Sequence, residues 1–151
     1  RREGLPDRAR NAAVSGATSA DVLSSLDWSL APDVRVVVVA VGANDGLRGL
    51  PLGPLENNLD AILARAKARG VKAVLAGMRI PPSMGADYAE RFAALYPRVA
   101  RRRGVPLIPF LLAGVGGRPE LNQADGIHPN AAGHRVVAGT VDAALRKAGL
   151  L

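Results

Sequence analysis

Two kinds of hydrophobic pattern alternate along this chain. Short continuous apolar runs, typical of strands buried on both faces, are separated by segments in which apolar residues recur every three or four positions. The strand-like runs span residues 12–14, 34–41, 72–78 and 105–110, and the helical segments begin near residues 54, 88 and 129. Strands that alternate with helices predict a parallel, flavodoxin-like sheet covered on both faces, which is a three-layer α/β/α sandwich.

Each helical segment has a predicted inward face. Pro54 suits the first position of a helix and Gly70 suits its end. The stripe between them comprises Leu55, Leu59, Ile62, Leu63 and Ala66. The next helix directs inward Tyr88, Phe92, Leu95, Tyr96 and Val99, and within it Pro97 predicts a kink or an interrupted turn. The last helix is predicted to direct inward Val136, Val137, Val141, Ala144 and Leu145.

Length and composition favour a single domain that covers residues 1–151. A chain of 151 residues can bury a substantial core, and no repeat or linker interrupts it. Because only 3% of the residues are aromatic, the core must be built mainly from alanine, valine and leucine. No apolar run approaches the roughly 20 residues of a membrane-spanning helix, so we expect no membrane span. The absence of cysteine excludes disulfides and thiol chemistry.

The net charge of +7 raises the question of nucleic-acid binding. Arg98, Arg101, Arg102 and Arg103 cluster at a predicted helix end, where the helix macrodipole favours cations without any ligand. No aromatic residues interleave with the arginines, as stacking on single-stranded nucleic acid would require. We therefore expect a solvated basic surface and no nucleic-acid partner.

The segment Asp125-Gly126-Ile127-His128-Pro129-Asn130 carries the strongest chemical signal. An acid three residues before a histidine, with a glycine between them, can belong to one short loop. A carboxylate beside one ring nitrogen fixes the tautomer and leaves the other nitrogen free as a general base. We therefore expect His128 and Asp125 to act together, whereas His134 falls within the last helix as a surface or packing residue.

Two further loops follow strand-like runs and are expected at the same edge of the sheet. Gly16 lacks a side chain, so its N–H can approach a reacting carbonyl closely. Asn44 can point its side-chain amide into the pocket that would hold this carbonyl. Each also has a structural alternative, Gly16 as a tight turn and Asn44 as an Asx-turn that bonds its own backbone. Asp45 is expected to bond neighbouring backbone and hold its loop.

In this order, the three loops resemble the sequence blocks of the SGNH (GDSL-type) hydrolases, at residues 11–19, 42–49 and 125–130. The string Gly-Ala-Asn-Asp-Gly-Leu-Arg-Gly and residues 78–81 narrow the resemblance to small bacterial arylesterases and thioesterase/lysophospholipase enzymes. The resemblance implies hydrolysis of an aryl ester, acyl thioester or lipid ester through a Ser-His-Asp triad.

In that reading His128 is the base, Asp125 orients it, and Gly16 with Asn44 forms the oxyanion hole. The resemblance also implies a small-molecule ester substrate and neither a metal nor an organic cofactor. It is compatible with a periplasmic or secreted location.

The chain departs from the family pattern at its start. Family members carry the nucleophilic serine in a Gly-Asp-Ser block after the first strand, whereas residues 1–10 contain no serine. We expect this chain to be the larger C-terminal fragment of a longer enzyme that lacks the first strand. A separate N-terminal segment or a neighbouring copy would then complete the sheet. Ser15 is the nearest internal candidate nucleophile, but a serine in this block is ordinarily structural.

The sequence leaves the substrate open. Leu47, Ile80, Pro81 and Pro82 are expected to line an apolar acyl site, which favours simple hydrophobic esters. One alternative is an inactive fragment or pseudoenzyme that binds an acyl or carbohydrate ligand, or a partner chain. Another is a flavodoxin-like nucleotide-binding or receiver domain, which the lack of a glycine-rich phosphate loop and of an early acidic cluster disfavours.

Overall fold

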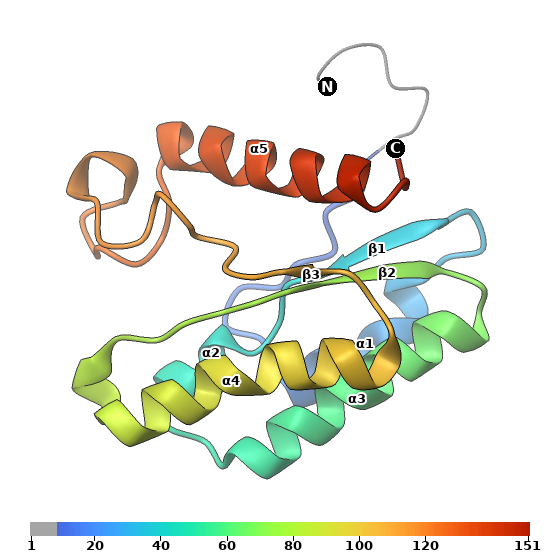
Figure 1. The fold of residues 1–151 in the computed structure, drawn as a ribbon, viewed down its shortest axis with the longest axis horizontal. Helices are drawn as coiled ribbons and strands as arrows, with labels where there is room; N and C mark the ends of the chain where they lie inside the picture. Colours follow the sequence, from blue (N-terminus) through green and yellow to red (C-terminus); the bar gives the residue numbers. More distant parts are fainter. Residues whose placement is uncertain (1–8) are drawn as a thin grey trace.

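The computed structural model describes residues 9–151, along which helices and strands alternate (Figure 1). In chain order the elements are α1 (Ser19–Ser29), β1 (Val36–Val39), α2 (Ala43–Leu47), α3 (Leu52–Ala68), β2 (Lys72–Ala76), α4 (Ala86–Arg103), β3 (Leu107–Ile108) and α5 (Ala131–Lys147), with 3-10 turns at Pro82–Met84 and Pro119–Leu121. The strands run parallel in the order β1-β2-β3, with Val36 opposite Lys72 and Leu75 opposite Leu107. The predicted fold class is confirmed.

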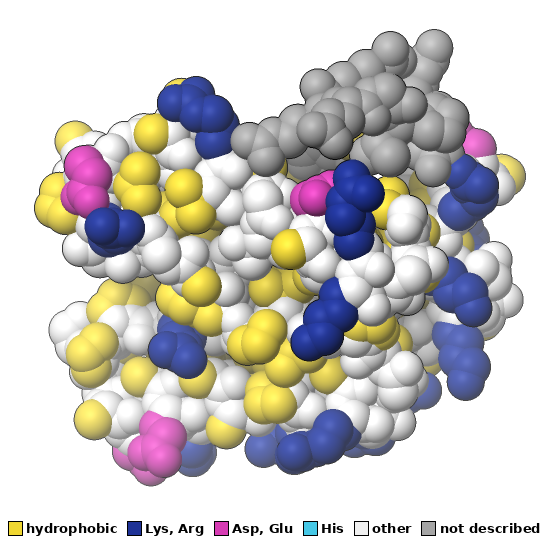
Figure 2. Space-filling model, turned by 45° about the horizontal axis from the view of Figure 1, so that its top comes forward, with side chains coloured by type: hydrophobic (Ala, Val, Ile, Leu, Met, Phe, Trp, Pro, Cys, Tyr) yellow, Lys and Arg dark blue, Asp and Glu magenta, His cyan; other side chains and the backbone are white. Residues whose placement is uncertain are grey.

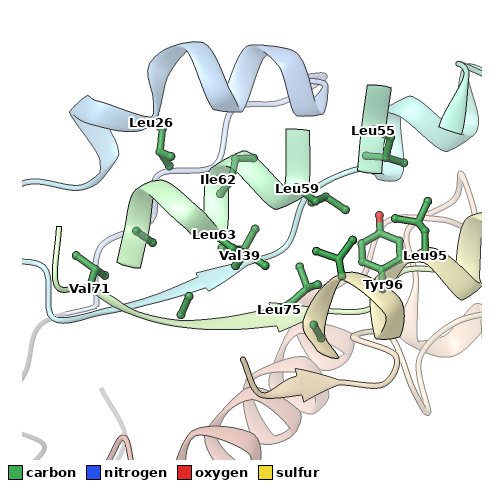
Figure 3. Packing of buried hydrophobic residues seen from close by; sticks show 14 of the residues in the cluster. Leu26, Val39, Leu55, Leu59, Ile62, Leu63, Val71, Leu75, Leu95 and Tyr96 are labelled. Carbon is green, nitrogen blue, oxygen red and sulfur yellow. The ribbon is translucent and has the colours of Figure 1, made fainter. Parts of the chain in front are cut away.

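The larger hydrophobic layer lies between the sheet and the helices α1, α3 and α4 (Figures 1 and 3). Every residue of the stripe predicted on α3 is buried. On α4 the rings of Phe92 and Tyr96 meet edge to face with centroids 5.5 Å apart, and both side chains are fully buried. α4 continues through Pro97 without the predicted interruption. The two long helices thus hold one face of the sheet.

Among the described residues, α5 is the helix that covers the opposite face, over a smaller cluster (Figure 1). Its buried residues Val74, Ala76 and Ile108 pack against the C-terminal half of the helix, including Val141 and Leu145. The inward orientation predicted for Val136 is wrong, because this residue is 39% exposed. The first turn of α5 packs on the preceding loop instead of the sheet: a Cβ on Gly133 would lie 2.2 Å from the carbonyl oxygen of Leu121.

The apolar run at residues 12–14 forms no strand, so this sequence prediction is also wrong. Val14 is 70% exposed, and within residues 9–151 this segment pairs with none of the strands of the sheet. β1 is the edge strand on this side, and three of its four valines are only half-buried. An apolar run becomes a strand only where a neighbour can take its backbone hydrogen bonds.

Charged side chains are spread over the surface. On the face drawn in Figure 2, Lys and Arg lie scattered among polar and apolar side chains rather than in one continuous stripe. No helix within residues 9–151 has the length and the apolar character needed to cross a membrane.

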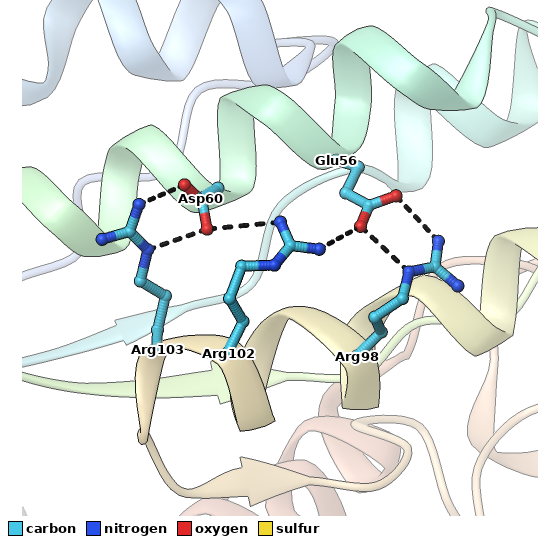
Figure 4. A network of polar contacts seen from close by, with 5 residues as sticks. All are labelled: Glu56, Asp60, Arg98, Arg102 and Arg103. Atoms are coloured by element: carbon cyan, nitrogen blue, oxygen red, sulfur yellow. Dashed lines mark hydrogen bonds and ion pairs between the residues drawn. The ribbon is translucent and has the colours of Figure 1, made fainter.

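The arginines at the end of α4 are paired with two acids of α3 (Figure 4). Arg98 donates two hydrogen bonds to the Glu56 carboxylate, at 2.9 and 2.7 Å. Arg102 contacts both Glu56 and Asp60, and Arg103 donates to Asp60. This Arg–acid ladder accounts for three of the four clustered arginines more directly than the helix macrodipole does. Hydrogen bonds from Arg98, then Arg102, lower the pKa of Glu56 to about 2.

Replacement Glu56→Gln should lower the free energy of unfolding at pH 7 by about 1 kcal/mol, because hydrogen bonds to charged groups contribute about 1.5–3 kcal/mol and the half-exposed arginines reduce this value. Because the pKa of Glu56 is lowered in the folded protein, its contribution is present above the ordinary value of 4.5 and is lost as the pH falls toward 2. Urea unfolding at a series of pH values should therefore show the two proteins converging below pH 4.5. Asp87→Asn, which breaks an exposed pair with Arg91, is the control, and an equal loss in both variants would contradict the ladder's role.

Candidate active site

The parallel strands place three loops at one edge of the sheet. α2 follows β1, the loop with the turn at Pro82–Met84 follows β2, and the long loop that leads to α5 follows β3. Figure 1 shows all three leaving the carboxyl ends of the strands on the same side. This edge is where ligands bind in open parallel sheets.

Asp125 and His128 form a direct pair in the loop after β3. The Asp125 Oδ2 lies 2.6 Å from the His128 Nδ1, and Asp125 Oδ1 accepts the backbone N–H groups of Ile127 and His128 at 3.0 Å each. The His128 side chain, followed by these two backbone N–H groups, lowers the pKa of Asp125 to about 2. A carboxylate in this position favours a hydrogen on Nδ1 and leaves Nε2 unprotonated, as a general base requires. The His128 side chain is 67% exposed.

The loop that carries this pair is closed by its own hydrogen bonds. The N–H of Gln123 donates to the carbonyl of His128 at 2.7 Å. Asn130 caps α5 by accepting two backbone N–H groups, and its amide donates to the carbonyls of Glu120 and Asn122. The helix therefore begins at Ala131, after the cap. This role of Asn130 was not predicted from the sequence, although asparagine is a strongly favoured N-cap residue.

Gly16 and Asn44 are brought together from loops far apart in sequence. Gly16 adopts φ +77° in a turn before α1, and the Asn44 side chain donates to the carbonyl of Ala17 at 2.9 Å. Arg48 donates to the carbonyl of Gly16 itself at 2.8 Å. The Asn44 amide thus holds the loop of Gly16 rather than its own backbone. Since this contact uses one of the two amide hydrogens, the other is left for a ligand.

Asp45 holds its loop as expected, but through a distant partner rather than neighbouring backbone. Its carboxylate is 4% exposed and accepts both the N–H and the hydroxyl of Ser19, which is fully buried at the start of α1. The sequence gives no sign of this contact, because Ser19 and Asp45 lie 26 residues apart. The contact ties α2 to the segment that carries Gly16.

The residues predicted to line an acyl site lie in different environments. Pro81 and Pro82 are exposed and Leu47 is half-buried. Ile80 is only 7% exposed and belongs to the core beneath α2, where it packs close to Gly46. A shallow hollow beside the Asp125–His128 loop is lined by Gly117, Arg118, Pro119, Asn122, Gln123, Ala124 and Gly126. Its lining includes neither His128 nor Asn44.

Titratable residues do not gather into a metal site here. Among residues 9–151, no group of three or more His, Asp or Glu side chains is placed to hold a metal ion.

Comparison with known proteins gives matches along most of the chain. A family model described as the GDSL-like lipase/acylhydrolase family matches residues 1–136. Esterase TesA of Pseudomonas aeruginosa is 44% identical over 128 residues, which cover 84% of this chain and 64% of that protein. Thioesterase 1/protease 1/lysophospholipase L1 of Escherichia coli K12 is 41% identical over 80% of this chain and 58% of its own length. The arylesterase of Vibrio mimicus is 37% identical, over 79% of this chain and 60% of its own length. The chain therefore spans about 60% of the length of these curated relatives.

Solved structures match the fold closely. The crystal structure of TesA superimposes with a TM-score of 0.91 at 40% identity, covering 98% of this chain and 82% of that one. The psychrotrophic esterase EstA from Pseudoalteromonas sp. gives a TM-score of 0.86 at 29% identity, over 91% and 76% of the two chains. AlinE4, an SGNH-hydrolase family esterase, gives 0.76 at 37% identity, over 96% and 78%.

The Asp125→Asn variant should change the tautomer of His128. An asparagine has one acceptor oxygen, and if the two backbone N–H groups keep it, its NH₂ faces Nδ1 and favours a hydrogen on Nε2. We expect the ¹⁵N NMR spectrum of the neutral His128 ring to show a protonated Nδ1 in the original protein and a shift toward Nε2 protonation in the variant. His134, exposed on α5, supplies an internal reference. A neutral ring protonated on Nε2 before any substitution would contradict the assigned pair.

Proposed function

We propose, because the chain belongs to the GDSL-like lipase/acylhydrolase family, that it supplies the histidine, the acid and the oxyanion hole of a serine hydrolase of carboxylic esters. The observation that carries the proposal is the 2.6 Å contact between Asp125 and His128, at the same sheet edge as the joined loops of Gly16 and Asn44. Aryl esters, acyl thioesters and lipid esters are the substrate classes, in keeping with the names of the relatives.

His128 would act as the proton carrier. As a serine hydroxyl attacks the acyl carbonyl, Nε2 of His128 takes the hydroxyl proton and the ring becomes positively charged. Asp125 holds the ring through Nδ1 and stabilises that charge. The imidazolium then protonates the leaving alcohol or thiol, and water releases the acyl group by the same route in reverse.

Gly16 and Asn44 would stabilise the negative oxygen of the tetrahedral intermediate. Donors held in place before the reaction need no reorganisation when charge develops, which makes such sites effective. Among the described residues, the Gly16 N–H has no hydrogen-bond acceptor, and Asn44 has one amide hydrogen beyond its bond to Ala17. These are the two hydrogens that the oxyanion would accept.

The nucleophilic serine would come from outside this chain, on a segment that pairs with the outer edge of β1. Within residues 9–151, β1 pairs only with β2, and its half-buried valines offer an apolar edge for one more strand. The greater length of the relatives supports this arrangement. We call this chain joined to the Gly-Asp-Ser segment of a family member the completed enzyme.

A fluorophosphonate probe, which reacts covalently with activated serines, tests the origin of the nucleophile. We expect no labelling of this chain alone and labelling of the completed enzyme at its Gly-Asp-Ser serine, detected by intact mass and peptide mapping. The completed enzyme with His128→Ala is the control and should remain unlabelled. Labelling of Ser15 in this chain alone would refute an external nucleophile. A folded completed enzyme that neither reacts nor hydrolyses p-nitrophenyl esters would favour the inactive binding module.

The completed enzyme should respond unequally to two substitutions at the site. His128→Ala removes the proton carrier and should nearly abolish turnover of p-nitrophenyl esters. Asn44→Ala removes one oxyanion donor and should lower kcat by roughly 10²–10³-fold. His134→Ala, on the exposed side of α5, should leave kcat within about twofold, as expected of a surface change. Unchanged turnover in Asn44→Ala would exclude this residue from the oxyanion hole.

A further inference from the structure

The segment before α1 and the segment of α2 are fastened together by three polar contacts in a row. Arg48 reaches the Gly16 carbonyl at the exposed end, and Asn44 reaches the Ala17 carbonyl in the middle. Asp45 and Ser19 form the innermost, buried contact. The two proposed oxyanion donors therefore belong to two chain segments, and these contacts set the relative position of the segments.

Both carboxylate oxygens of Asp45 and the hydroxyl of Ser19 have hydrogen-bond partners. Asp45 Oδ2 accepts the Ser19 N–H at 2.8 Å, and Asp45 Oδ1 accepts the Ser19 hydroxyl at 2.6 Å. The Ser19 Oγ in turn accepts the Asn58 amide of α3 at 3.0 Å. The chain of donors thus runs from α3 through the first residue of α1 to α2. A carboxylate at a helix N-terminus also meets the positive end of the helix dipole.

α2 depends on outside contacts for its position. The helix has five residues, too few to be stable alone, and Gly42 before it adopts φ +112° and supplies no side-chain cap. Its inner side is pressed on the core, since a Cβ at Gly46 would lie 2.6 Å from the Phe92 ring. That packing sets the distance between α2 and the core. The hydrogen bonds of Asp45 then set the position of α2 relative to the loop of Gly16.

Retention of a buried carboxylate here calls for an explanation beyond holding two helices together. Burying a charge is costly unless it is paired, and the described part of the chain places no Lys or Arg within ion-pair distance of Asp45. An apolar contact would join α1 to α2 at lower cost. The carboxylate instead accepts two hydrogen bonds with a defined geometry. Asp45 directly follows Asn44 in α2, and its partner Ser19 comes three residues after Gly16.

We propose that Asp45 and Ser19 are positioning residues, which hold the Gly16 N–H and the Asn44 amide at the spacing of a single oxyanion hole. The inference rests on the proposed function of Gly16 and Asn44. It adds that their spacing is set by the buried hydrogen bonds between α1 and α2, and not by the turn of Gly16 or by α2 on its own.

The Ser19→Ala variant tests this proposal, with Asp21→Ala as the matched control. Asp21 accepts the N–H and the hydroxyl of Thr18 at the same end of α1, but this capping box is exposed and, among the described residues, makes no hydrogen bond to α2. Both variants should lose stability at the start of α1. Only Ser19→Ala should displace the ¹⁵N–¹H NMR signals of the Gly16 N–H and the Asn44 side-chain amide.

In the completed enzyme, Ser19→Ala should lower kcat by roughly 10–100-fold with KM within about threefold, because a misplacement of the order of 1 Å costs up to 10²-fold in rate. Asp21→Ala should leave both constants within about twofold. If Ser19→Ala does not fold, Asp45→Asn replaces it: the amide keeps the size of the side chain but turns one of the two oxygens that accept the Ser19 hydrogens into an NH₂ donor, so one of the two bonds is lost. It should displace the same two signals and lower kcat.

Three results would overturn the proposal: unmoved Asn44 and Gly16 signals in the folded variant, equal movement in Asp21→Ala, or a change confined to KM. Failure of the proposed function would give a different experimental result from failure of this inference. A completed enzyme without any turnover before substitution would refute the hydrolase, while the NMR comparison would still decide whether Ser19 and Asp45 set the positions of the two donors.

Discussion

The packing of α3 and α4 against one face of the sheet is the constraint on which the rest of the structure depends. This layer holds nearly all of the fully buried large side chains, including Leu59, Leu75, Phe92 and Tyr96. The Arg–acid ladder joins the same two helices on their outer side. Because α3 and α4 are also the crossovers that connect the strands, the strands run parallel, and every loop that leaves a carboxyl end emerges at one edge. The core thereby determines where the site is, while the hydrogen bonds of the loops determine its local geometry.

How much could be predicted depended on how far apart the interacting residues lie in sequence. The buried stripe of α3 follows from helical periodicity, and Asp125 with His128 follows from spacing within one loop, so both could be read locally. The contact between Asp45 and Ser19 joins residues 26 apart, and the ladder joins residues more than 40 apart. Nothing in a local pattern identifies such partners, although each side chain is visible as a candidate for some polar contact.

Two of the wrong predictions share a physical cause. Residues 12–14 and Val136 are apolar, and for each the local pattern alone predicts a buried position. Burial depends on what lies opposite, however: no described strand lies beside 12–14, and the first turn of α5 rests on the loop near Leu121. Apolar periodicity indicates which side chains would gain from burial. It does not indicate whether the fold supplies a surface there.

The two halves of the site belong to parts of the molecule that are supported by different amounts of buried apolar packing. Gly16 and Asn44 are tied to α1, α2 and the large core through Asp45, Ser19 and Gly46. His128 lies on a loop held by its own hydrogen bonds and by Asn130, next to a helix whose cluster, within residues 9–151, has three buried residues. Local opening costs least where few apolar contacts must be broken. Because His128 and Asp125 belong to one short loop, a movement of that loop as a whole would carry both residues and leave their 2.6 Å contact intact.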